Sequence, residues 1–250
     1  MLTMFSPVQT QIDTYFPPST HLYRRLKAYI RAMVGHDAHV LEVGCGREAP
    51  LLRRIAPKVA AAYGMDLMPL DAVGSGLDLR SMSVTDMRAF LNESFDLVYS
   101  RSVMEHVEEP ARAFAEIHRV LRPGGHYIFL TPNKHDYASI TARFVPNRLH
   151  GRIVNFLTGR AERDIFPTFY RANTKHDISQ MAQEAGFTIT SFDYLSQYPH
   201  YLSFSRPLFW VGCQYERMIA RTNLLRGLRG WILCCLTKCG SRSDDRRGTR

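Results

Sequence analysis

The chain has 250 residues, of which 45% are apolar and 22% charged, and this composition predicts one folded domain with insertions rather than a low-complexity or disordered chain. No apolar run approaches the roughly 20 residues that a transmembrane helix needs. The spacing of the five cysteines does not match a zinc site; they are Cys45, Cys213, Cys234, Cys235 and Cys239. The net charge of +9 is compatible with a partner that carries negative charge.

Residues 1–36 are expected to form an N-terminal helical segment. Within Ser19–Val34, apolar side chains recur at helical spacing: Leu22, Leu26, Tyr29, Ile30 and Met33. This helix is expected either to cover a bound ligand as a lid or to pack against the domain. Because Met1–Pro18 lacks the basic start and apolar core of a signal peptide, and the thiols are expected to be reduced, we expect a cytoplasmic protein.

The most informative stretch is residues 40–46, Val-Leu-Glu-Val-Gly-Cys-Gly, a short apolar strand that ends in a glycine turn. Such a turn lies at the carboxyl end of a strand in an open α/β sheet, where ligands bind. Gly44 and Gly46 allow backbone to approach a ligand closely, and Glu42 can accept hydrogen bonds from a ribose or an ammonium group.

The spacing of Gly44, Gly46 and Ala49 also fits the dinucleotide fingerprint, and Asp66 follows about 20 residues later, as a ribose-binding acid would. From this stretch alone, a nicotinamide-dependent oxidoreductase therefore remains an alternative. A binding protein without catalytic activity is a second alternative.

Further strands and helices alternate along the chain. A short helix is expected over Leu51–Ile55, and a second strand ends at Asp66. The elements expected after these are a strand at Phe95–Ser100, a helix at Ala111–Leu121, a turn at Arg122–Gly125, a strand at His126–Thr131, a helix at Asp177–Ala185, and strands at Phe187–Tyr194 and Trp231–Thr237.

Five blocks in this order carry a resemblance to a known family: Glu42–Gly46, Gly64–Asp66, Ser94–Val98, Glu105–Val107 and Leu121–Gly125. With them the sequence resembles the class I S-adenosylmethionine-dependent methyltransferases, specifically the bacterial methyltransferase type 11 group. The resemblance implies an α/β, Rossmann-like, doubly wound seven-stranded sheet with an antiparallel last strand over residues 37–240. It also implies S-adenosyl-L-methionine as the cofactor.

The resemblance further implies roles for single residues. The glycine loop would line the methionine part of the cofactor, Asp66 would hold the ribose hydroxyls, and Met65 and Leu67 would flank the adenine. The acid that accepts from the adenine amino group is expected to be Asp86, with Asp78 as the alternative. The expected cofactor-binding residues are Glu42, Gly44, Cys45, Gly46, Asp66, Leu67, Asp86, Met87, Ser100 and Arg101.

Methyl transfer in this family is a direct in-line displacement that requires no metal, so holding the reactants in line carries much of the rate. For a hydroxyl acceptor, His106 is the expected base because imidazole titrates near neutral pH, and Glu105 is expected to assist it. The alternative is that His106 only shapes the pocket. The acceptor is expected to be a small molecule, a lipid-linked molecule or a glycan, methylated at oxygen.

Residues 133–175 form a substrate-side insertion that is too long for an ordinary loop. Its segment Phe166–Arg171 mixes aromatic side chains with a cation. Tyr170 and Arg171 are expected to touch the substrate, or else to pack against the edge of the sheet.

Residues 200–230 are expected to form a basic amphipathic insertion, with Leu208, Val211, Tyr215, Met218 and Ile219 on one helix face and Arg217 and Arg221 opposite. Residues 200–250 hold ten Lys and Arg against three Asp and Glu, so +7 of the net +9 lies there. This pattern predicts peripheral contact with the inner face of a membrane, with a helix packed on the domain as the alternative. Nucleic acid is not favoured, since no recognition module is found, and residues 241–250 are expected to be a disordered basic tail.

Overall fold

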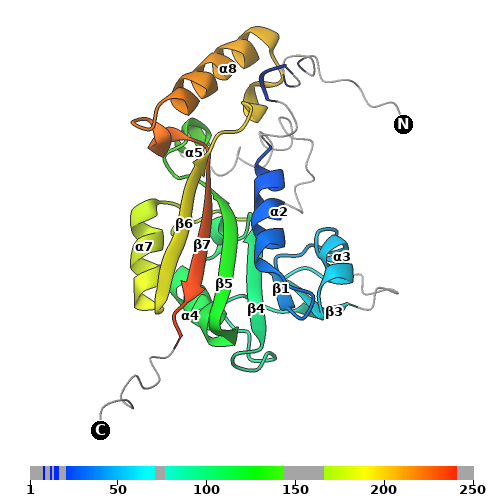
Figure 1. The fold of residues 1–250 in the computed structure, drawn as a ribbon. Helices are drawn as coiled ribbons and strands as arrows, with labels where there is room; N and C mark the ends of the chain where they lie inside the picture. The colour runs from blue at the N-terminus through cyan, green and yellow to red at the C-terminus, as the bar shows by residue number, and fades with distance from the viewer. Residues whose placement is uncertain are drawn as a thin grey trace.

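The computed structural model describes residues 21–70, 77–142 and 166–240, together with residues 8, 12 and 14–16 near the N-terminus. A seven-stranded sheet with the order β3-β2-β1-β4-β5-β7-β6 forms the centre of these parts (Figure 1). The strands are β1 His39–Val43, β2 Ala61–Asp66, β3 Asp78–Ser81, β4 Phe95–Arg101, β5 Leu121–Pro132, β6 Phe187–Leu195 and β7 Trp231–Lys238. Strands β1 to β5 pair in parallel, whereas β7 runs antiparallel to both β5 and β6, as predicted.

Helices cover both faces of the sheet, because its central strands are apolar on both sides. On one face, α4 (Pro110–Val120) and α7 (Lys175–Glu184) contribute buried side chains such as Phe114 and Ile178 to a core cluster. On the other face, α2 (Leu22–Met33) and α3 (Leu52–Ile55) contribute Leu26, Ile30 and Leu52 to a second cluster. The predicted doubly wound architecture is therefore confirmed, and the helix predicted in the N-terminal segment is present.

The predicted turn at Arg122–Gly125 was wrong as an element boundary. Helix α4 ends at Val120, and β5 already begins at Leu121, which pairs with Phe95 across an irregularity in the register. Gly124 has a φ of 81°, and a Cβ on Gly125 would lie 2.9 Å from the Arg122 carbonyl oxygen. The glycines thus bend the chain as expected, but the bend is a bulge inside the strand, because the ladder to β4 skips residues 122–125 and resumes where His126 pairs with Leu97.

The remaining short elements are η2 Ala56–Lys58, η3 Met104–His106, α5 Tyr137–Ala142, η5 His200–Leu202 and η6 Arg226–Leu228. Helix α8 (Arg206–Arg221) lies beside α5, where the Tyr137 and Tyr215 rings meet edge-on with centroids 5.6 Å apart. Since α5 follows the carboxyl end of β5, α8 lies at the ligand-binding edge of the sheet (Figure 1). No helix in the described parts is long and apolar enough to cross a membrane.

The face that α8 buries is not the apolar face expected from the sequence, since Ile219 is the one member of that face among the buried residues. Its buried residues are Phe209, Gly212, Cys213, Glu216 and Ile219. Of the predicted apolar face, Leu208, Val211 and Met218 are 46%, 57% and 52% exposed. Phe209 and Cys213 instead pack in a small cluster with Val8 from the N-terminal segment, a contact that helical periodicity alone does not reveal.

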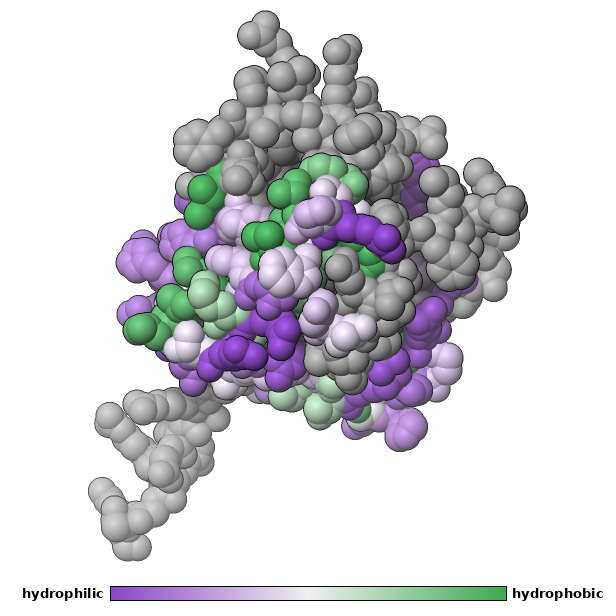
Figure 2. All heavy atoms as spheres, turned by 90° about the horizontal axis from the view of Figure 1, so that it is seen from above, coloured by the Kyte–Doolittle hydropathy of each residue, from purple (hydrophilic) through white to green (hydrophobic). Residues whose placement is uncertain are grey.

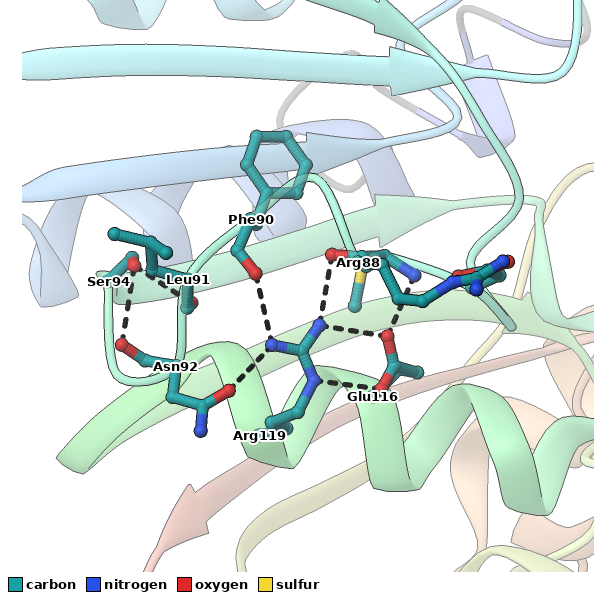
Figure 3. Close-up of polar contacts among 9 residues, drawn as sticks. Arg88, Phe90, Leu91, Asn92, Ser94, Glu116 and Arg119 are labelled. Carbon is teal, nitrogen blue, oxygen red and sulfur yellow. Dashed lines mark hydrogen bonds and ion pairs between the residues drawn. The ribbon is translucent and has the colours of Figure 1, made fainter.

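An ion pair on α4 fixes the loop between β3 and β4 (Figure 3). The Arg119 guanidinium donates to both Glu116 carboxylate oxygens, to the Met87 and Phe90 carbonyl oxygens at 2.9 and 3.0 Å, and to Asn92 Oδ1 at 2.8 Å. Glu116 Oε2 in turn accepts from the Met87 backbone N–H at 2.7 Å. Because both side chains are hydrogen-bonded to the loop backbone, they determine the path of the loop between β3 and β4, whose first residues line the cavity at the carboxyl ends of the strands.

Candidate cofactor and active site

A cavity of about 350 Å³ opens at the carboxyl ends of β1, β2 and β4. This is a topological switch point, since the chain crosses from β1 to β2 on one side and reaches β4 on the other. The volume is in the range of small-molecule sites. The lining residues are Val43, Gly44, Met65, Asp66, Leu67, Met82, Ser83, Val84, Thr85, Arg101, Ser102, Val103, His106, Val107, Glu108, Glu109 and Phe166.

The two glycines of the loop after β1 serve different needs. Both have a positive φ, 72° at Gly44 and 71° at Gly46, which glycine adopts without strain. A Cβ on Gly44 would lie 2.2 Å from Val103 Cγ2, whereas a Cβ on Gly46 would meet nothing within 4 Å. Gly44 is therefore required by packing inside the protein. Gly46 is favoured by its positive φ alone, and it does not line the cavity, so its contact with the cofactor stays a prediction.

Asp66 lies on the cavity wall and also holds the glycine loop. Its Oδ2 accepts from the Gly46 N–H at 2.8 Å, and its Oδ1 accepts from the Met68 N–H at 3.0 Å. A carboxylate has about four acceptor positions, so two remain for vicinal hydroxyls. This geometry fits the ribose of S-adenosylmethionine.

Four of the predicted cofactor residues lie behind the cavity wall. Glu42 is buried and accepts from the Tyr99 hydroxyl at 3.2 Å; burial raises its pKa to about 8, opposed by the nearby Arg101 cation. Burial likewise raises the pKa of the Cys45 thiol to about 12, Met87 belongs to the core, and Ser100 Oγ is hydrogen-bonded to Tyr127. Direct contact of these four with the cofactor stays a prediction.

Asp86 does not line the cavity. Its carboxylate pairs with Arg88 at 2.6 Å, because the Met87 N–H is held by Glu116 and the loop turns the Asp86 side chain away. The alternative, Asp78, pairs with Arg80 and begins β3 at the opposite end of the strand. From this loop the cavity is instead lined by the hydroxyl side chains of Ser83 and Thr85, which the sequence analysis did not predict as cofactor contacts.

Arg101 lines the cavity and connects it to the N-terminal helix. Its guanidinium lies 4.7 Å from the centroid of the Tyr23 ring in α2, a cation–π contact. The start of α2 thus lies next to the cavity, and its function as a lid stays a prediction.

Of the predicted catalytic pair, His106 lines the cavity and Glu105 does not. His106 Nδ1 lies 2.8 Å from the Pro167 carbonyl oxygen. Since a carbonyl oxygen can only accept, Nδ1 carries the hydrogen and the lone pair of the neutral ring is on Nε2. Nε2 lies 3.9 Å from Oε1 of the buried Glu105.

Tyr170 and Arg171, predicted to touch substrate, do not line the cavity. The Tyr170 N–H donates to the Glu105 carbonyl oxygen at 3.3 Å, and Arg171 Nη1 donates to the Glu108 carbonyl oxygen at 2.7 Å. Phe166 of the same segment does line it, with its ring centroid 5.9 Å from that of His106. Residues 166–171 therefore brace the turn that carries Glu105 and His106, and they contribute one aromatic side chain to the cavity.

The strand order with antiparallel β7, the glycine loop and the carboxylate at the end of β2 define a class I S-adenosylmethionine-dependent methyltransferase. A family model described as "Methyltransferase domain" matches residues 19–192, and the chain belongs to this family. The predictions of enzyme class and of S-adenosylmethionine as the cofactor are thereby confirmed.

Curated relatives include the ubiquinone biosynthesis O-methyltransferases of Pseudomonas syringae pv. tomato, 29% identical over 123 residues, and of Hahella chejuensis, 31% identical over 118 residues. These alignments cover 44% and 46% of this chain, and 53% and 44% of the relatives. The chain thus spans about half the length of the curated relatives it matches.

Among solved structures, an S-adenosylmethionine-dependent methyltransferase from Mesorhizobium loti has a TM-score of 0.57 at 20% identity, covering 86% of this chain and 96% of that one. Geranyl diphosphate C-methyltransferase from Streptomyces coelicolor has a TM-score of 0.57 at 12% identity, covering 86% and 79%. At these identities the likeness supports the fold.

Proposed function

We propose that this methyltransferase transfers the methyl group of S-adenosylmethionine to a hydroxyl oxygen of a small or lipid-linked acceptor by direct in-line displacement. The observation that carries the proposal is the tautomer of His106, because the Pro167 carbonyl oxygen leaves the proton-accepting lone pair on Nε2 at the cavity wall. The O-methyltransferase names of the curated relatives support oxygen as the acceptor atom.

In this mechanism the bound cofactor supplies an electrophilic methyl group on a sulfonium. Asp66 binds the ribose hydroxyls, and Ser83 and Thr85 are suited to hydrogen-bond the adenine edge. His106 Nε2 accepts the hydroxyl proton as the oxygen attacks. Glu105, 3.9 Å away, stabilises the imidazolium that results.

The test uses radiolabelled S-adenosylmethionine with 3,4-dihydroxybenzoate as a probe acceptor. We expect His106→Asn to lower kcat by about 100-fold, since general-base catalysis contributes factors of this order. Calorimetric binding of S-adenosylhomocysteine should stay at the wild-type affinity. Unchanged kcat in His106→Asn would refute the base, and methylation at carbon or nitrogen would refute the acceptor atom.

We also propose that residues 200–230 contact the surface of an anionic membrane. Leu208, Val211 and Met218 are half exposed on α8, with Arg206 and Arg221 also exposed at its two ends. Figure 2 views the molecule from above, the side on which α8 lies in Figure 1, and hydrophobic residues in green lie there beside hydrophilic residues in purple. Such a surface gains apolar burial in the headgroup region and about 1 kcal/mol per basic residue near anionic lipid.

Sedimentation with vesicles of phosphatidylglycerol and phosphatidylcholine tests the membrane proposal. We expect binding to phosphatidylglycerol-rich vesicles that weakens with salt and is lost in a Leu208→Ser, Val211→Ser, Met218→Ser triple variant. Leu91→Ser is the matched control, because Leu91 is 81% exposed on the loop between β3 and β4. Equal losses in the triple variant and the control would contradict the proposal.

A further inference from the structure

We infer that Thr131 and Asn173 are positioning residues for the methyl transfer, because they hold the Glu105 carboxylate beside His106. This inference rests on the proposed role of His106 as the base. Thr131 is at the carboxyl end of β5 and Asn173 precedes α7, so sequence distance alone does not link them to the catalytic turn.

The three side chains form a buried chain of hydrogen bonds. Asn173 Nδ2 donates to Thr131 Oγ1 at 2.7 Å and to the Pro132 carbonyl oxygen at 2.7 Å. Thr131 Oγ1 donates to Glu105 Oε2 at 3.1 Å. Thr131 and Asn173 are fully buried and Glu105 is 4% exposed, so the group lies away from bulk water.

The direction of each hydrogen bond in this chain is fixed. The Pro132 carbonyl oxygen can only accept, so the amide must turn its NH2 group, and not its oxygen, toward Pro132 and Thr131. Thr131 Oγ1 therefore accepts from Asn173, and its one hydrogen is directed to Glu105. In this amide orientation Asn173 Oδ1 is buried without a hydrogen-bond partner in the described structure, which is unfavourable in free energy.

The consequence for Glu105 is that Oε2 is held as an acceptor, which favours the ionised carboxylate. The other oxygen, Oε1, is the one that faces His106 Nε2. The segment that precedes Asn173 also fixes the imidazole ring of His106. The Pro167 carbonyl oxygen accepts from Nδ1 of that ring, and the Phe169 N–H donates to the Glu105 carbonyl oxygen at 2.8 Å. Residues 166–173 thus orient both the base and the charge that stabilises its protonated form.

The inference predicts how the His106 ring titrates, a readout that needs no acceptor. In NMR titrations, with the His106 signals assigned from the spectrum of His106→Asn, we expect Glu105→Gln to lower the midpoint by about one pH unit. Thr131→Val should lower it by about half a unit, since the carboxylate loses a donor to its charged form. Asn173→Leu should act in the same direction as Thr131→Val.

Two matched variants separate positioning from a structural effect. Thr131→Ser keeps the hydroxyl and should restore the wild-type midpoint, and Thr190→Val, the same substitution on β6, should leave it unchanged. The other charged groups that line the same cavity as His106 are Asp66, Arg101, Glu108 and Glu109, and Arg171 is bound to the Glu108 carbonyl oxygen. All of them are kept in every variant. In turnover with 3,4-dihydroxybenzoate, Thr131→Val should lower kcat about tenfold with the KM for S-adenosylmethionine unchanged.

A wild-type midpoint in folded Thr131→Val would overturn the inference, and so would failure of Thr131→Ser to restore it. Failure of the proposal that His106 is the base can be told apart from failure of this inference. Unchanged turnover in His106→Asn would refute the base, whereas the titration midpoints still decide whether Thr131 controls Glu105.

Discussion

The two glycines of the cofactor loop make a matched pair for testing what the loop requires. Gly44→Ala and Gly46→Ala each place a methyl group at a φ near 70°, where an L-residue is strained by about 1 kcal/mol. Only at Gly44 does that methyl group meet another side chain, because its position lies 2.2 Å from Val103 Cγ2. Non-bonded carbon atoms do not approach this closely, so Val103 or the loop must move.

The expected loss of unfolding free energy is about 1 kcal/mol for Gly46→Ala, from backbone strain alone. For Gly44→Ala the overpacking against Val103 adds about 1–3 kcal/mol, which gives a total of about 3 kcal/mol. The loop cannot yield easily, since the Gly44 and Cys45 N–H groups are both tied to the Met65 carbonyl oxygen, at 2.8 and 3.1 Å.

Urea unfolding of the protein without cofactor measures both losses, provided that the slope m is the same in all variants. Gly44→Ala, Val103→Ala completes a double-mutant cycle and should recover the overpacking part, leaving the backbone strain. Equal destabilisation by the two glycine variants, or no coupling between positions 44 and 103, would refute the assignment of the cost to Val103.

Three further outcomes are expected. The pKa of Glu42 is raised to about 8, so the folded protein binds a proton at this carboxyl more tightly than the unfolded chain does. The free energy of unfolding should therefore fall by at most about 5 kcal/mol as pH rises from about 4.5 to 8, and this fall should vanish in Glu42→Gln. A Glu42→Gln stability curve parallel to that of the wild type would contradict the prediction. Arg119→Met should cost about 2 kcal/mol in urea unfolding, because the Met87 and Phe90 carbonyls lose their donor, and amide exchange in the loop between β3 and β4 should accelerate; wild-type exchange rates there would be the contrary result. Asp66→Asn should weaken S-adenosylhomocysteine binding in calorimetry by about 10- to 100-fold, the effect of losing hydrogen bonds to a charged acceptor, and an unchanged affinity would remove Asp66 from the ribose site.

The sequence by itself determined the elements whose signals are local. Apolar runs predicted β1, β2 and β4, of which the first ends in a glycine turn and the second in an acid. The two glycines with Asp66 predicted the ligand edge, because such turns lie at the carboxyl ends of parallel strands. His106 and Glu105 are adjacent in sequence and follow the same strand, so their placement at that edge was also predictable.

Only the tertiary structure decided which side chains face the cavity and which face of α8 is buried. Asp86 points away because Glu116 and Arg119, about 30 residues later, hold the loop backbone from another element. Leu208 and Val211 are exposed because Phe209 and Cys213 pack against Val8, about 200 residues earlier in the chain. The link from Asn173 through Thr131 to Glu105 joins three separate elements, and no periodicity within one element encodes it. Helix and strand periods follow from local backbone geometry, whereas side-chain direction at a loop and the choice of packing face depend on partners that folding brings together.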